Sequence, residues 1–514
     1  MADPVAITQQ SFAGGMRDRD HPSLLAETEY AYAKNIDIRD GGLASTRPGS
    51  STKTLSAGGV PQGSKFYQAV SGVTAIVQVN SGRFYYWEGS STTWTQIGVT
   101  QLNNVSSAVG IAILNGRIFF FCGVSDHTYS WDGIAASLTD EGDTNNDPIL
   151  GVLCCQQAGR LCASIGSASS TSDYVFFSDI FDGQTFARST NNKRTPTDGS
   201  EPITALATYR KEEILTFTRF STHVWNISGS TVSSFSRNQL DARIGCVAPK
   251  TVVVVGDDAF FLGADKQLRT IKRTAQDLAF GVSTPVTYLV PNLMERITRN
   301  YMYLAAGVFF DNYYLLAVPM DNSTTNNSVI VFDMLHQRQT PSGLVPVCVG
   351  EWTNINAADW VISYFNNKPQ LYFIHSTTGK AVLLFEDTND DGETIDVEIQ
   401  TRAYDFGAPA QDKTAEDGEI LIIDSYGTLT IRFAKDDALF NSLTSAVVGD
   451  PFGATLPLQL PFTLAGAGAV GPTKFELYGQ GQSRYWQLKF NHADGIINIK
   501  QYTIRAFVEA FASR

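Results

Sequence analysis

The chain has 514 residues, of which 43% are hydrophobic and 17% charged, and its formal net charge is −13. This composition is that of a folded protein with more than one domain, and it excludes wholesale disorder. Because affinity for phosphate depends on clustered cations, the acidic balance argues against tight binding of DNA. The longest apolar runs fall short of 18 residues, which excludes an ordinary membrane-spanning helix.

Residues 1–59 differ in pattern from the rest of the chain and are expected to form an N-terminal extension with a first edge strand. Residues 1–4 show no secretory signal. Pro22 and the acidic residues after it predict two or three helical turns over residues 24–34. Residues 35–39 alternate like a strand and precede a turn at residues 41–42.

From residue 60 onward, a turn-forming residue is repeatedly followed by a short run of bulky apolar residues. The motif recurs roughly every 48 residues, which is within the period of four-stranded propeller blades. Each copy predicts a strand, and valine- or phenylalanine-rich strands precede some of the turns. The seven copies begin at Gly82, Gly116, Gly159, Glu212, Asp257, Asn312 and Lys368.

Such a repeat cannot bury its apolar face alone, so the copies should close into a ring. Closure also removes exposed sheet edges, which would otherwise promote aggregation. The expected fold class is therefore all-β, with a β-propeller over residues 60–405 that has six to eight blades, seven being favoured.

After residue 405 the spacing changes and the predicted strands are longer. Residues 419–423, 429–433, 485–490 and 502–507 read as strands. Trp486, Leu488 and Phe490 share one face, which is the alternation of a half-buried antiparallel sheet. Residues 406–514 are therefore expected to form a separate C-terminal domain resembling a β-sandwich.

One segment matches the calcium-loop pattern D-x-[DN]-x-[DN]-G-x5-E in full, with Gly392 at the bend. Alternate oxygen ligands in this spacing would wrap a hard cation. The flanking residues 381–385 and 395–399 read as strands and not as the helices of an EF-hand, so an acidic β-hairpin turn explains the same residues. The candidate calcium ligands are Asp387, Asn389, Asp391, Glu393 and Glu398.

Other motifs favour structural roles. Residues 178–186 approach the Asp-box of sialidases but have the wrong spacing and occur once, so a β-turn is the simpler interpretation. Residues 466–471 match GxGxxG, but the flanking prolines argue against a dinucleotide site. The six histidines are scattered, and the six cysteines lack CxxC spacing and should be buried, reduced thiols. With no catalytic constellation, we expect a protein that is not an enzyme and needs no cofactor, calcium apart.

The first fifty residues contain a further pattern, which runs through Phe12–Met16, then Asn35-Ile36-Asp37, then Gly42-Leu43, and ends at Arg47-Pro48-Gly49. This pattern resembles the start of phage virion propeller proteins. Residues 159–161, 175–179, 217–225 and 401–407 agree more loosely, and 401–407 would be the edge of the final blade. The resemblance spans roughly residues 8–407 and leaves the C-terminal domain without a counterpart.

The resemblance is to the tail nozzle, hub or stabilisation proteins of short-tailed phages. It implies a homo-oligomeric ring, commonly of six copies, below the portal and adaptor proteins, with tail fibre or plug proteins as further partners. Duplex DNA would pass through such a ring without specific binding, because an acidic lining repels it. The protein would be made in the host cytoplasm and reside in the virion tail.

Two alternatives stay open. A glycan-binding or glycan-degrading propeller tail protein would also use this fold, although glycosidases need two carboxylates that the sequence cannot single out. A calcium-stabilised adhesion module is the third possibility, and it rests on the loop at residues 387–398.

Overall fold

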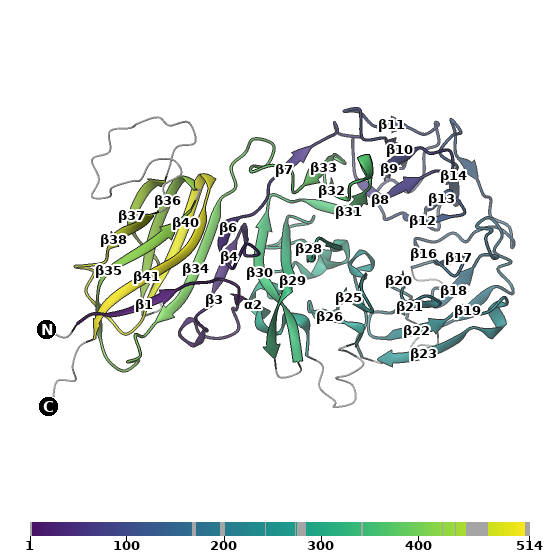
Figure 1. Cartoon of the computed structure of the whole chain (residues 1–514). Coiled ribbons are helices and arrows are strands. Elements are labelled where there is room, and N and C mark those ends of the chain that lie inside the picture. The colour runs from purple at the N-terminus through teal and green to yellow at the C-terminus, as the bar shows by residue number, and fades with distance from the viewer. Residues whose placement is uncertain are drawn as a thin grey trace.

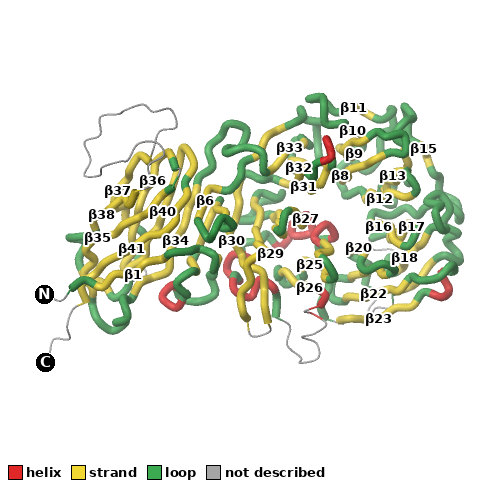
Figure 2. The backbone as a smooth tube through the Cα atoms, viewed as in Figure 1, coloured by secondary structure: helices red, strands yellow, loops and turns green. Residues whose placement is uncertain are grey.

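The computed structural model describes residues 3–166, 171–195, 201–241, 243–272, 274, 284–340, 343–423, 425–436, 438–448 and 471–508. Strands dominate, and the ring of blades lies beside a two-layered β domain (Figure 1). The predicted all-β propeller is therefore confirmed. Figure 2 shows how little helix there is. Short helical segments are η1 (Pro22–Leu24), η2 (Val232–Ser234), η3 (Pro249–Thr251), η4 (Val286–Leu289), α2 (Pro291–Glu295), η5 (Arg299–Leu304) and η6 (Phe365–Asn367).

Six sheets in the described part of the chain are separate blades, each an antiparallel meander of three or four strands. In five of them the strands follow one another in sequence, as expected for local hairpin pairing, and the sixth adds a strand from the N-terminal segment. The first blade consists of β8 (Pro61–Gln68), β9 (Thr74–Asn80), β10 (Arg83–Trp87) and β11 (Thr95–Gln96). The second consists of β12 (Gly110–Leu114), β13 (Arg117–Phe121), β14 (Tyr129–Trp131) and β15 (Thr139–Asp140). The third consists of β16 (Leu153–Gln157), β17 (Arg160–Ser164), β18 (Tyr174–Phe177) and β19 (Asn192–Arg194).

The other three separate blades complete most of the ring. The fourth blade consists of β20 (Ala205–Thr208), β21 (Glu213–Phe217), β22 (Thr222–Asn226) and β23 (Ser236–Asp241). The fifth consists of β24 (Val253–Val255), β25 (Asp258–Leu262) and β26 (Leu268–Thr270). The last separate blade consists of β31 (Ala357–Ser363), β32 (Gln370–His375) and β33 (Ala381–Leu384) together with β7 (Ser50–Thr52).

A further blade-like unit belongs to a sheet that the propeller shares with the C-terminal domain. It consists of β27 (Ala306–Phe310), β28 (Tyr313–Val318), β29 (Ser328–Thr340) and β30 (Gly343–Thr353), within a nine-stranded sheet. Strand β27 contacts both β24 and β31, and β31 contacts β8, so the inner strands close the ring. The blade number lies in the predicted range of six to eight.

The ring is closed by a strand from the N-terminal segment. Strand β7 pairs antiparallel with β33, with Thr52 opposite Val382 and Ser50 opposite Leu384. The sequence assigned residues 401–407 to the edge of the final blade. That expectation is wrong, because β34 (Val397–Tyr404) pairs with β4 (Tyr32–Lys34) and with β40 (Trp486–Ile496) instead.

The rest of the N-terminal segment joins the propeller to the C-terminal domain. Strand β4 lies between β30 and β34 in the nine-stranded sheet. The predicted helix over residues 24–34 is wrong: after the short η1 turn, β3 (Glu29–Tyr30) and β4 are strands. Pairing with strands far along the chain overrides the weak local helix preference. Strand β3 pairs with β2 (Gly15–Met16).

The C-terminal domain is two sheets packed face to face, as predicted. One contains β35 (Lys413–Ile422), β38 (Gly471–Glu476), β39 (Gln482–Ser483), β41 (Asn498–Val508), and the N-terminal strands β1 (Val5–Gln9), β5 (Ile36–Asp37) and β6 (Ala44–Thr46). The other is the outer half of the nine-stranded sheet, with β34, β40, β36 (Tyr426–Lys435) and β37 (Asn441–Val448). Trp486, Leu488 and Phe490 are at most 1% exposed.

A single hydrophobic core runs from the propeller into the sandwich. It includes Leu315 and Trp352 of the propeller unit together with Trp486 and Ile504 of the sandwich. The indole N–H of Trp352 donates to the carbonyl of Ile36 at 2.7 Å. The two domains therefore share buried apolar area, which ties them more firmly than a polar interface would.

Strand β1 is anchored by a buried polar contact. Gln9 is fully buried, and its side-chain carbonyl accepts from the hydroxyl of Tyr502 at 2.6 Å and from that of Tyr404 at 3.4 Å. We expect Gln9→Met to lower the free energy of unfolding by about 1–3 kcal/mol, because both tyrosine hydroxyls lose this acceptor. Urea unfolding measures the change.

The control is Gln10→Met, the same substitution at the exposed neighbour, which should change stability by less than about 0.5 kcal/mol. Equal effects of the two substitutions would contradict the role given to Gln9.

Candidate functional site

The predicted calcium loop lies where the propeller closes, and its polar groups have protein partners. Asn389 accepts from the backbone N–H of Gly392 at 2.7 Å, and the carboxylate of Asp391 accepts from the N–H of Thr52 at 2.6 Å. Asp387 accepts from the N–H of Thr388 at 2.7 Å. The loop therefore bonds to the closing strand β7.

Glu393 and Glu398 are placed differently. The backbone of Glu393 pairs with that of Asp390. The Glu398 carboxylate, on β34, forms an ion pair with Lys489 at 2.5 Å. Burial acts to raise the pKa of Glu398, but the bonds from Lys489 and Gln400 lower it overall. In the part of the chain that the structure describes, no group of three or more His, Cys, Asp or Glu side chains is placed to hold a metal ion. Calcium binding stays a prediction.

The residue of this loop with the most partners is Asp390, which the sequence pattern did not select. Its carboxylate accepts from Arg47 Nη1 at 3.1 Å and Nη2 at 2.5 Å, and from the hydroxyl of Ser50 at 2.9 Å. Arg47 also donates to the carbonyl of Thr353 at 2.8 Å and to the side chain of Asn35 at 3.1 Å. Arg47 is 1% exposed and Asp390 8% exposed.

This ion pair joins the N-terminal segment, strand β30 and the closing loop at one point. Glycine is required beside it, because a Cβ at Gly49 would clash with the backbone oxygen of Asn389. In the sequence, this contact is signalled only by the Arg47-Pro48-Gly49 motif. The spacing of residues does not identify Asp390 as the partner of Arg47.

We expect Asp390→Ala to lower the free energy of unfolding by about 3–5 kcal/mol, because the buried Arg47 guanidinium loses its counter-charge. Chemical denaturation measures the change. Asp387→Ala in the same loop removes an exposed carboxylate and serves as the control, with an expected loss below about 1 kcal/mol. A smaller loss for Asp390→Ala than for the control would contradict this assignment.

A central cavity of about 760 Å³ runs between the inner strands. An ion pair between Lys250 and Asp359 at 3.0 Å lines the cavity, and the Asp359 carboxylate also accepts from the N–H of Ser64 at 2.9 Å. Tyr303 and Tyr364, each 57% exposed, also line it. The volume is that of a small-molecule pocket.

Cys154 lines this cavity, but it is not an activated nucleophile. Burial raises the pKa of the Cys154 thiol to about 12, so the thiol stays protonated at neutral pH. All six cysteines are free, and five are buried, as predicted from their composition.

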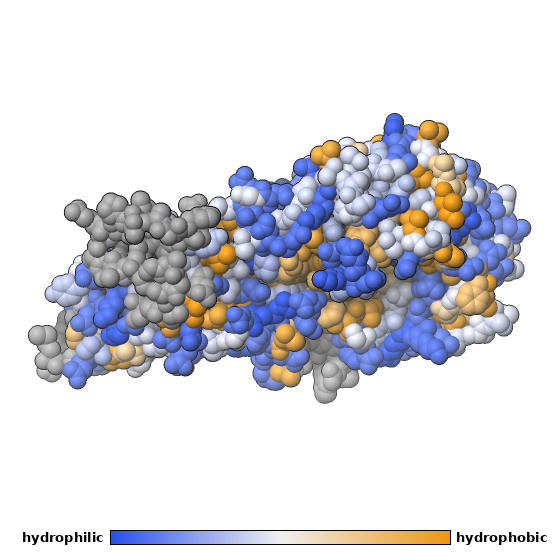
Figure 3. Space-filling model, turned by 45° about the horizontal axis from the view of Figure 1, so that its top comes forward, coloured by the Kyte–Doolittle hydropathy of each residue, from blue (hydrophilic) through white to orange (hydrophobic). Residues whose placement is uncertain are grey.

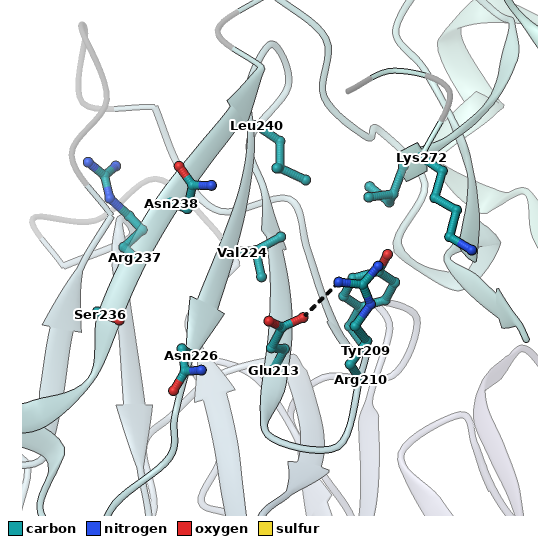
Figure 4. Close-up of a pocket in the computed structure, with 11 residues that line it drawn as sticks. Tyr209, Arg210, Glu213, Val224, Asn226, Ser236, Arg237, Asn238, Leu240 and Lys272 are labelled. Atoms are coloured by element: carbon teal, nitrogen blue, oxygen red, sulfur yellow. Dashed lines mark ion pairs between the residues drawn. The ribbon is translucent and has the colours of Figure 1, made fainter. Parts of the chain in front are cut away.

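A second cavity, of about 340 Å³, lies at the outer rim between the blade of β20–β23 and the blade of β24–β26. Figure 4 shows Val224 and Leu240 on neighbouring strands, with Tyr209, Arg210 and Lys272 across from them. Arg210 and Glu213 form an ion pair at 4.0 Å. The remaining lining residues are Asn226, Ser236, Arg237, Asn238 and Ile271, of which the two asparagines contribute amides and Ser236 a hydroxyl.

The sheet of this pocket contains a buried histidine. Arg237 donates to Nδ1 of His223 at 3.3 Å, and Nε2 lies 2.9 Å from the hydroxyl of Ser221. These partners suit the neutral imidazole, because protonation would place an N–H against a guanidinium. Burial, followed by the charge of Arg237, lowers the pKa of His223 to about 4.

Because the folded state binds fewer protons at His223 than the unfolded state between pH 6.5 and 4, stability should fall as the pH drops through that window. The expected loss from this group is about 3 kcal/mol. We expect His223→Gln, which stays neutral, to remove that part of the pH dependence. Urea unfolding of both proteins at several pH values tests this, and parallel stability curves would contradict it.

Two further sequence motifs, the approximate Asp-box and the GxGxxG match, can be placed on the chain. Asp179 and Asp182 form a tight turn, with the N–H of Asp182 bonded to the carbonyl of Asp179 at 3.3 Å. The GxGxxG match at residues 466–471 falls almost entirely outside the described residues. None of the helices described is long and apolar enough to cross a membrane.

Comparisons with known proteins show the fold alone. No family model and no curated protein sequence matches the chain. Similar solved structures include a chain of the mitotic checkpoint complex, with 10% identity and a TM-score of 0.43 over 66% of this chain and 96% of that one. The N-terminal part of BBS1 in complex with ARL6 gives 10% identity and 0.42 over 67% and 99%. YCF48 bound to a D1 peptide gives 8% identity and 0.37 over 66% and 100%.

Proposed function

We propose that the protein is a structural, non-enzymatic subunit of a phage tail. In this role it forms part of a homo-oligomeric nozzle or hub ring below the portal and adaptor proteins and contributes to the conduit for DNA ejection. Loops between blade strands dock neighbouring tail proteins, such as fibres or a plug. The protein is made in the host cytoplasm and resides in the virion.

The observation that carries this proposal is the role of the residues in the phage-like N-terminal pattern. Asn35 is 1% exposed and donates to Thr353 and to the carbonyl of Asp396, and Asp37 accepts from the hydroxyl of Tyr313. Together with Arg47, they tie the closing segment to the propeller. A pattern whose polar members Asn35, Asp37 and Arg47 bond the N-terminal segment to the propeller suits a subunit that must resist mechanical force.

Size and charge support a conduit formed between copies. The inner strands of one propeller line a cavity of small-molecule size, so in this proposal DNA passes through the middle of a ring of several chains. A net charge of −13 on each chain gives the wall of that passage the same sign as DNA, which limits counterion release and sticking.

We expect negative-stain images of the purified protein or parent virion to show a ring whose hole admits a duplex, with a particle mass that is a multiple of the 56.0 kDa chain. Duplex DNA should bind only weakly at physiological salt. A virion that lacks the protein, or strong salt-sensitive binding of duplex DNA, would overturn the proposal.

The alternative, a glycan-binding or glycan-degrading tail protein, is favoured by the rim pocket of Figure 4. Tyr209 offers an aromatic face, and Asn226 and Asn238 offer amides beside the cations Arg210 and Lys272. Such a set suits an acidic sugar. Loss of host polysaccharide on incubation with the protein would support this alternative over a purely structural role.

A further inference from the structure

The central cavity lies among the inner strands of the ring. Its lining comes from β8, β12, β16, β20, β27 and β31 and from the segment around η3. Among the described strands, each of these six pairs along one edge only, so its other edge faces the centre of the ring (Figure 2). Figure 3 shows polar and apolar residues interspersed on one face of the molecule, so a concave site, and not surface hydrophobicity, singles out a place for a ligand.

Two glycines let the inner strands approach closely beside the cavity. A Cβ at Gly63 on β8 would clash with the carbonyl oxygen of Val109, and a Cβ at Gly110 on β12 would clash with that of Val152. The N–H of Val109 also donates to the carbonyl of Gln62 at 3.1 Å, which joins the first two blades. The cavity wall is therefore closely packed backbone, and a site that is already formed binds a ligand at a small ordering cost.

The charges in the lining differ from those of the chain as a whole. The chain has 38 lysines and arginines against 51 aspartates and glutamates. The lining has two lysines, Lys65 and Lys250, and one carboxylate, that of Asp359. The cavity therefore has a positive balance within an acidic protein, which favours an anionic ligand over a cationic one.

The Asp359 carboxylate is satisfied by groups of the protein itself. It pairs with Lys250 at 3.0 Å and accepts from the N–H of Ser64 at 2.9 Å. Its other oxygen accepts from the N–H of Trp360 at 3.0 Å. This set of contacts joins η3, β31 and β8 across the ring, and it balances the charge of Lys250.

Lys65 is the cation of the lining that has no carboxylate partner. Its ammonium donates to the carbonyl of Ile111 at 3.3 Å, and no described residue forms an ion pair with it. Burial raises the pKa of the Cys154 thiol to about 12, whereas the charge of Lys65 acts to lower it, so the ammonium lies near this wall of the cavity. A bond to a neutral carbonyl leaves the charge of Lys65 unbalanced, and an acidic group would form the stronger, charge-assisted bond.

Aromatic rings supply much of the apolar surface of the cavity. The exposed rings of Tyr303 and Tyr364 line it together with Phe66 and Trp360. Phe66 packs edge-on against Tyr364, with ring centroids 5.9 Å apart. The indole N–H of Trp360 donates to the carbonyl of Ala306 at 3.1 Å, so its ring offers apolar surface alone. Rings of this kind favour a ligand with a flat aromatic body.

We propose that the central cavity binds a small organic anion with an aromatic body. Its acidic group pairs with Lys65, and its ring lies against the aromatic side chains of the lining. Phe66 follows Lys65 directly on β8, so the two kinds of contact are offered side by side. The volume of about 760 Å³ suits a ligand of this size. Binding of such an anion does not depend on ring assembly or on a role in a phage tail.

The test uses the full-length protein and two dyes that share the same rings. Anilinonaphthalene sulfonate is an anion, phenylnaphthylamine is uncharged, and both fluoresce more strongly in an apolar site. Lys65→Met removes the ammonium and keeps an unbranched apolar side chain, whereas Lys65→Arg keeps the charge. The controls are Lys500→Met, at an exposed position of the sandwich, and Lys272→Met in the rim pocket. Because Lys65 is exposed, its variants should fold, and circular dichroism checks this.

We expect the sulfonate dye to bind the unmodified protein and both controls with equal affinity. It should bind Lys65→Met at least about tenfold more weakly, because a hydrogen bond between charged groups is lost. Lys65→Arg should bind it like the unmodified protein, and the uncharged dye should bind every variant alike. Naphthoate, an aromatic carboxylate, should displace the sulfonate dye.

Equal affinity of the sulfonate dye for Lys65→Met and for the unmodified protein would overturn the proposal. A loss of affinity confined to Lys272→Met would also overturn it, because the dye would then occupy the rim pocket. The same holds for an unmodified protein that does not bind the sulfonate dye, and for a dye that naphthoate does not displace. Each of these failures would leave the proposed role in a phage tail in place.

Discussion

The buried ion pair of Arg47 with Asp390 is the contact on which the architecture depends. A guanidinium without solvent must be fully paired, and here the loop after β33, the carbonyl of Thr353 and the side chain of Asn35 share that task. Satisfying it places β7 against the last blade and β4 beside the sandwich. The same contact therefore links the closing strand to the segment that carries β4, which lies between the propeller unit and the sandwich.

The strands of the propeller were predictable because their apolar runs and turns are local. All seven repeat motifs are strands, although the copy at Gly82 begins the third strand of its blade whereas the others begin the second. This difference explains the short first step of the repeat. The strand alternation of Trp486, Leu488 and Phe490 was predictable for the same reason.

The N-terminal segment was mispredicted because its partners are distant in sequence. Residues 24–34 have helix signals at short range, but the edges of β30 and β34 supply hydrogen bonds that a helix would leave unmade. The calcium pattern was limited for a related reason. Its spacing selected Asp391 and Glu398 as ligands, whereas Asp390, the loop residue with the most hydrogen-bond partners, falls between the pattern's ligand positions. Which apolar residues stay exposed, such as Val70, Ile134 and Phe181, depends on neighbouring blades and has no local signature.

The proposed ring of like-charged copies poses a physical problem. A net charge of −13 on each chain repels DNA but also opposes assembly, so contacts between copies would have to lie where charge is absent or paired. Arg47 and Asp390 hold the closing strand against the last blade, and one hydrophobic core runs from the propeller into the sandwich, so the blades and the sandwich form one unit. A repeated head-to-tail contact between such units closes into a ring only if the rotation from each copy to the next completes a full turn, and otherwise it builds an open filament.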